Sequence, residues 1–71
     1  METIKKLFHV DRKDINYLRS TIESYDGMAV VSTLNPRTAV IEIQIPPGFE
    51  EQVDELIDSL RNEDGISIFE T

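Results

Sequence analysis

The stretch NPRTAVIEIQI, residues 35–45, holds both a turn signal and the clearest strand alternation in the chain. Asn35 and Pro36 suit the first two positions of a type I turn, because asparagine bonds to the backbone there and proline fixes φ. After the turn, isoleucine at every second position predicts a strand with one buried face. Together these signals predict an antiparallel hairpin that joins residues 28–34 to residues 39–45.

The expected turn also predicts how the two strands of the hairpin pair. With a loop over residues 35–38, Val30 would lie opposite Ile43 and would share the buried isoleucine face. A slip of one residue would move every side chain to the other face, so the register decides what the surface carries. The same register puts three residues on the opposite face: Ala29, Val31 and Thr33.

On the N-terminal side of the hairpin we expect a strand and then a helix. Residues 3–10 read as a strand with Lys5, Leu7 and His9 on one face. Asp11 is the expected N-cap of the helix, and Asp26-Gly27 is its expected end. The apolar stripe of this helix has helical spacing and consists of Ile15, Leu18, Ile22 and Tyr25.

On the C-terminal side we expect a second helix and a last short strand. Pro46-Pro47-Gly48 stops the hairpin strand, because proline cannot donate to a sheet ladder, and Gly48 is the expected N-cap. The helix is expected to end at Asp64-Gly65, and residues 66–69 to form the strand. Its apolar stripe consists of Phe49, Val53, Leu56, Ile57 and Leu60.

The element order predicts the fold class. Two right-handed strand–helix–strand crossovers place both helices on one face of a four-stranded antiparallel sheet, with the first and third strands central. This is a ferredoxin-like βαββαβ two-layer sandwich of the α+β class, a single domain over residues 1–71. The expected core consists of Val30, Ile41, Ile43, Ile15, Leu18, Ile22, Val53, Leu56 and Leu60.

Composition excludes several classes of function. The 71 residues include no cysteine, so disulfides and cysteine-ligated metals are excluded. A net charge of −7 disfavours nucleic acid and anionic membranes as partners, because both require a cationic surface. No apolar run approaches the roughly 20 residues of a membrane span, and the opening residues lack a signal peptide, so we expect a cytoplasmic protein.

The charge is unevenly spread along the chain. Bases concentrate in residues 1–20 and acids in residues 50–64. This asymmetry predicts that Arg12, Lys13 and Arg19 of the first helix lie near acids of the second.

No group of residues specifies a chemistry. His9 is the single histidine and lacks the partners that an active site requires, so we interpret it as a solvated strand residue. The acids of the second helix follow helical spacing rather than the spacing of a calcium loop, and we interpret them as a solvated face. We therefore expect no catalytic residue, no metal ligand, no cofactor and no enzymatic activity.

The sheet face away from the helices is the candidate interaction surface. A core this small is marginal alone, and the predicted edge strand has no charge or proline to prevent pairing. We expect a homodimer or another protein partner, with a small-molecule ligand as a further possibility. The residues proposed for the surface are Leu7, His9, Ala29, Val31, Thr33 and Val40.

Two resemblances add to this interpretation. The topology resembles that of ACT-type regulatory domains, which implies a ligand such as an amino acid bound between subunits. Residues 10–15, 25–27 and 45–49 are similar in sequence to a bacterial family of domains of unknown function. The hypotheses are thus a non-catalytic binding or regulatory module that self-associates, an ACT-like sensor of amino acids, and, third, an accessory subunit of an enzyme.

Overall fold

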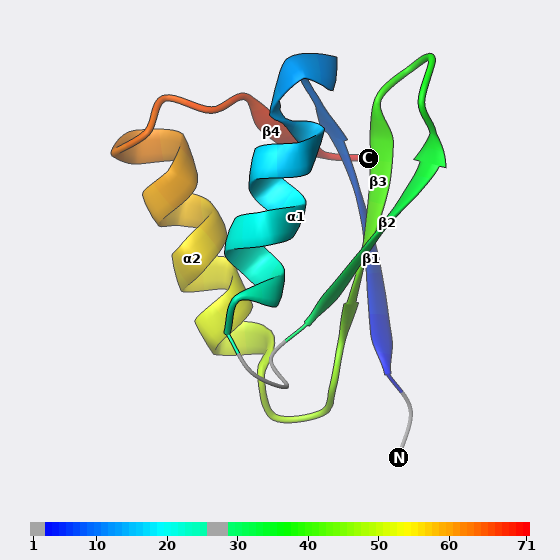
Figure 1. The fold of residues 1–71 in the computed structure, drawn as a ribbon. Coiled ribbons are helices and arrows are strands. Elements are labelled where there is room, and N and C mark those ends of the chain that lie inside the picture. Colours follow the sequence, from blue (N-terminus) through cyan, green and yellow to red (C-terminus); the bar gives the residue numbers. More distant parts are fainter. Residues whose placement is uncertain (1–2, 26–28) are drawn as a thin grey trace.

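The computed structural model describes residues 3–25 and 29–71. It confirms the predicted α+β sandwich: two helices cover one face of a four-stranded antiparallel sheet (Figure 1). The strand order β2-β3-β1-β4 puts β1 and β3 at the centre, as predicted. The elements are β1 (Ile4–Val10), the 3-10 turn η1 (Arg12–Asp14), α1 (Ile15–Glu23), β2 (Val30–Asn35), β3 (Val40–Ile45), α2 (Glu50–Asn62) and β4 (Ile68–Glu70).

The isoleucines of β3 form the centre of the core. Ile41, Ile43 and Ile45 are each at most 1% exposed, whereas the residues between them are half-buried. This alternation is the expected one for a strand with one face against the helices. The same hydrophobic cluster contains Phe8, Val10 and Ile68 from the sheet, Leu18 and Ile22 from α1, and Val53, Ile57 and Leu60 from α2.

Most of the predicted core is confirmed, with one clear error. Ile15 and Leu56 are half-buried and pack against the core cluster. Val30 is 54% exposed, so its assignment to the core is wrong. The predicted residues that are buried are Leu18, Ile22, Ile41, Ile43, Val53 and Leu60.

The error at Val30 comes from the hairpin register. The structure pairs Val31 with Ile43, and a β-bulge near Leu34 adds a residue to β2. Ala39 has a φ of 56°, so the connection differs from a simple type I turn. The hydrophobic pattern could not reveal this shift, because positions 30 and 31 are both valine.

The corrected register changes the predicted surface. Ala29 and Val31 are 7% and 4% exposed and belong to the core. Thr33 lies opposite Ile41 and is half-buried on the same side. These three residues therefore face the helices rather than the opposite face.

The helix ends differ in detail from the predicted caps. Asp11 makes no side-chain cap bond, and η1 precedes α1. The predicted end at Asp26-Gly27 lies outside the described residues. Phe49, not Gly48, is the N-cap of α2, while Gly48 has a φ of 92° in the preceding turn.

Gly65 follows the C-terminal end of α2 at Asn62, close to the helix end predicted at Asp64-Gly65. Its φ is 68°, a left-handed conformation that glycine adopts without steric cost. The N–H of Ile66 donates to the carbonyl of Leu60 at 3.1 Å, which satisfies one of the free carbonyls of the helix end. The last strand then begins at Ile68, two residues later than predicted.

The two adjacent valines of β2 test the register. Val31→Thr should lower the free energy of unfolding by about 1–3 kcal/mol, because it places a hydroxyl in the apolar core. Val30→Thr should change it by less than about 0.5 kcal/mol, because that side chain is exposed. Urea denaturation measures both, and the reverse ranking would contradict the register.

Candidate interaction surface

The sheet face opposite the helices is the main candidate surface, and no other element of the described part covers it (Figure 1). We call it the open face. The alternation of side chains along each strand assigns its members. They are Lys5, Leu7 and His9 of β1, Val30 and Ser32 of β2, Val40, Glu42 and Gln44 of β3, and Phe69 of β4.

Apolar side chains are prominent on this face. Phe69 is 67% exposed and Val30 is 54% exposed. Leu7 and Val40 are half-buried. In the strand pairing His9 lies between Val40 and Phe69, so these three residues form a row across β3, β1 and β4. Exposed apolar groups that lie together on one surface often mark an interaction site. Phe69 and Val40 belong to such a row, whereas Val30 lies apart from them on the opposite edge strand, beside Gln44.

The structure brings together only half of the predicted surface residues. Leu7, His9 and Val40 lie on the open face, as expected. Val30 and Phe69 belong to it but were missed. The correct register would have identified Val30 as a surface residue. Ile68 is buried, so its neighbour in the strand, Phe69, points outward.

The charged residues of the open face, as assigned above, are Lys5 and Glu42. Gln44 Nε2 donates to Glu42 Oε1 at 3.0 Å, which holds the carboxylate close to the sheet. This face therefore carries charges of both signs. The acids of α2 lie in the helix layer, on the other side of the sheet (Figure 1).

One sheet edge is formed by β2, as predicted, but side chains of α1 reach it. Glu23 Oε2 accepts a hydrogen bond from the N–H of Val31 at 2.8 Å. Arg19 Nη2 donates to Thr33 Oγ1 at 3.3 Å. The predicted free edge is thus partly covered, and Arg19 contacts β2 rather than an acid of α2.

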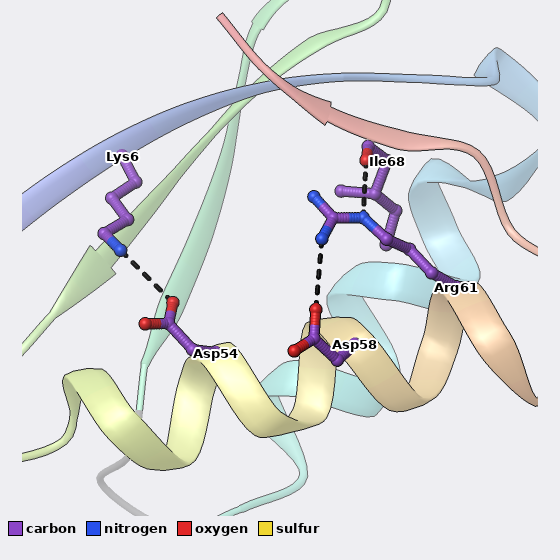
Figure 2. Close-up of polar contacts among 5 residues, drawn as sticks. All are labelled: Lys6, Asp54, Asp58, Arg61 and Ile68. Atoms are coloured by element: carbon purple, nitrogen blue, oxygen red, sulfur yellow. Dashed lines mark hydrogen bonds and ion pairs between the residues drawn. The ribbon is translucent and has the colours of Figure 1, made fainter.

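The other sheet edge is formed by β4 and is reached from α2. Arg61 Nε donates to the carbonyl of Ile68 at 2.7 Å, and its Nη1 contacts Asp58 Oδ1 at 3.1 Å (Figure 2). Nearby, Lys6 Nζ lies 3.2 Å from Asp54 Oδ1. Within the described residues, the ion pairs of α2 therefore involve Lys6 and Arg61 instead of the bases of the first helix.

A groove of about 270 Å³ lies between α2 and the strands β1 and β4. Buried Phe8 and Ile57 contribute its apolar part. Its charged lining includes acids and bases in close proximity, and we call it the charged groove. The charged residues are Lys6, Asp54, Asp58, Arg61 and Glu70.

The exposure of Phe69 makes it a suitable probe of the open face. Phe69→Lys should change the free energy of unfolding of the monomer by less than about 1 kcal/mol, because the ring buries little surface. Ile68→Lys is the contrasting neighbour and should prevent stable folding, since it buries a charge. Urea denaturation at low protein concentration compares the two, and equal losses would contradict the assigned faces.

Comparison with known proteins identifies a family but no characterised relative. Among the described residues, no helix is both long and apolar enough to cross a bilayer. No curated protein and no solved structure gives a significant match. The model of the domain of unknown function DUF4911 matches residues 8–63, which include β1 from Phe8 onward and everything to the end of α2. The chain belongs to the DUF4911 family of domains of unknown function.

Proposed function

We propose that this chain is a non-catalytic interaction module whose open face binds a second copy of itself. The observation that carries the proposal is the exposure of Phe69 and Val30 on a sheet face without a covering layer. Packing two such faces together would remove these side chains, with Leu7 and Val40, from water. Burial of apolar area is the main driving force of most protein association.

The area of the open face sets the expected affinity of the dimer. Four strands about 4.8 Å apart, the longest of which has seven residues at about 3.3 Å each, give a face of at most roughly 19 by 23 Å. Two such faces bury at most roughly 900 Å², which is below the size of standard specific complexes and in the range of weak ones. The proposed dimer is therefore weak, with a dissociation constant in the micromolar range or above.

The charges of the open face favour a second copy as its occupant. In a two-fold dimer the same surface of both protomers meets itself. Lys5 of one protomer then has Glu42 of the other as an available partner of opposite charge. Association through the β2 edge is less favourable, because Glu23 already occupies the N–H of Val31.

The non-catalytic role is supported by the surroundings of His9. Its cross-strand neighbours are Val40 and Phe69, which supply neither a proton acceptor nor a nucleophile. A cytoplasmic location completes the proposal, and the cysteine-free sequence is compatible with it.

Sedimentation equilibrium tests the dimer. The parent should show an average mass that rises above 8.1 kDa with concentration. Phe69→Lys and Val30→Lys should each weaken association at least about tenfold, because each places an ammonium group in the interface. Ser20→Lys adds the same charge at an exposed position of α1 and should leave association unchanged.

Two outcomes would reject this proposal. One is a parent that stays at 8.1 kDa up to about millimolar concentration, where even a weak dimer should form. The other is equal weakening by Ser20→Lys, which would indicate a general charge effect.

The charged groove favours a second function, an ACT-like sensor of amino acids whose site lies within one chain rather than between subunits. A free amino acid carries one carboxylate and one ammonium group. Lys6 and Arg61 could pair with the carboxylate, while Asp58 and Glu70 could pair with the ammonium group. Buried Phe8 and Ile57 offer apolar contact for a side chain.

A thermal-shift screen against the free amino acids tests the sensor. A ligand of the groove should raise the melting temperature by mass action, and Lys6→Met should abolish most of that rise. Lys5→Met makes the same chemical change on the open face and should preserve it. A rise that both variants retain would place the ligand elsewhere, and no rise with any amino acid would reject the sensor.

A further inference from the structure

The β2 edge has the composition of a strand that recruits further strands. Val30–Asn35 contains no charged residue and no proline. The N–H of Val10 donates to the carbonyl oxygen of Ala39. The backbone N–H and C=O groups of odd-numbered β3 residues therefore point toward β1, and those of even-numbered residues point toward β2. Val30 and Ser32 pair with even-numbered residues of β3, so their backbone groups bond to β3. The backbone groups of Val31 and Thr33 are left at the outer edge of the sheet. Such unpaired groups are a template for edge-to-edge association.

Glu23 occupies one of the two outward N–H groups of this edge, that of Val31. Its Oε2 accepts from the N–H of Val31 at 2.8 Å in a partly buried contact. One turn earlier on α1, Arg19 reaches Thr33 Oγ1 at 3.3 Å. An incoming strand would have to place a carbonyl oxygen where a carboxylate already lies, and the two would repel each other.

The opposite edge is closed in the complementary way. The N–H of Thr71 donates to the carbonyl oxygen of Leu7. Because the backbone groups of successive strand residues point to opposite sides, the carbonyl of Ile68 points away from β1. Arg61 Nε donates to this carbonyl at 2.7 Å, and Asp58 contacts the same guanidinium (Figure 2). A carboxylate thus covers a free donor at β2, and a guanidinium covers a free acceptor at β4.

We infer that Glu23 and Arg61 block strand addition at the two edges of the sheet. At β2, where the strand is longer and uncharged, removal of the Glu23 carboxylate makes the edge a docking site for β2 of a second copy. This assembly is distinct from a dimer through the open face, and it does not depend on that dimer.

Two variants of Glu23 test this inference. Glu23→Ala removes the acceptor and should give species larger than the parent in sedimentation velocity at equal concentration. Glu23→Gln keeps a carbonyl oxygen at the same place and should sediment as the parent does. In dilute protein, where the monomer predominates, amide exchange at Val31, followed by NMR, should become roughly tenfold faster in Glu23→Ala and much less so in Glu23→Gln, because only alanine leaves the N–H of the monomer without an acceptor.

Thr33→Pro separates edge pairing from general aggregation. It removes an outward N–H from β2 without removing a bond to β3, so the double variant Glu23→Ala/Thr33→Pro should return to the size of the parent. Adding Phe69→Lys to Glu23→Ala should leave the edge assembly intact, which distinguishes it from association through the open face. The inference is overturned if Glu23→Ala sediments as the parent does, or if Thr33→Pro fails to suppress its assembly.

Discussion

The inward direction of the three isoleucines of β3 determines how the rest of the sheet is arranged. β3 is a central strand, so its face fixes the faces of both neighbours through the antiparallel pairing. With Ile41 inward, its partner Phe8 is also inward, and His9 must point outward. The open face is therefore a consequence of core packing, and its apolar members are those left over when both helices have covered the other side.

The helices stabilise the sheet in two ways at once. α1 buries Leu18 and Ile22, and the residues directly after them, Arg19 and Glu23, reach β2. α2 repeats this relation, since Leu60 is buried and the following residue contacts β4. Successive helical residues lie about 100° apart, so a side chain next to the buried stripe is well placed to extend past the margin of the sheet. Core packing and edge protection thus come from adjacent positions of the same helices.

The fold was predictable because its signals agree over long segments. The alternation of β3, the prolines after it and the two helical stripes each point to the same order of elements. The register of β2 was not predictable, because valine at both 30 and 31 suits either phase and the bulge near Leu34 has no clear signature. This one local feature moved Ala29, Val31 and Thr33 from the expected surface to the helix side. The contacts of Glu23 and Arg61 depend on three-dimensional proximity, which periodicity does not describe.

The two edge contacts also have an order in time. Glu23 precedes Val31 by eight residues, and Arg61 precedes Ile68 by seven. A chain made from its N-terminus at about 5–20 residues per second therefore contains each capping side chain roughly a second before the strand that it caps. The loop between cap and strand is short in both cases, so its closure costs little entropy. During synthesis on the ribosome, neither edge strand has to wait for a distant part of the chain before its outer backbone groups can be covered.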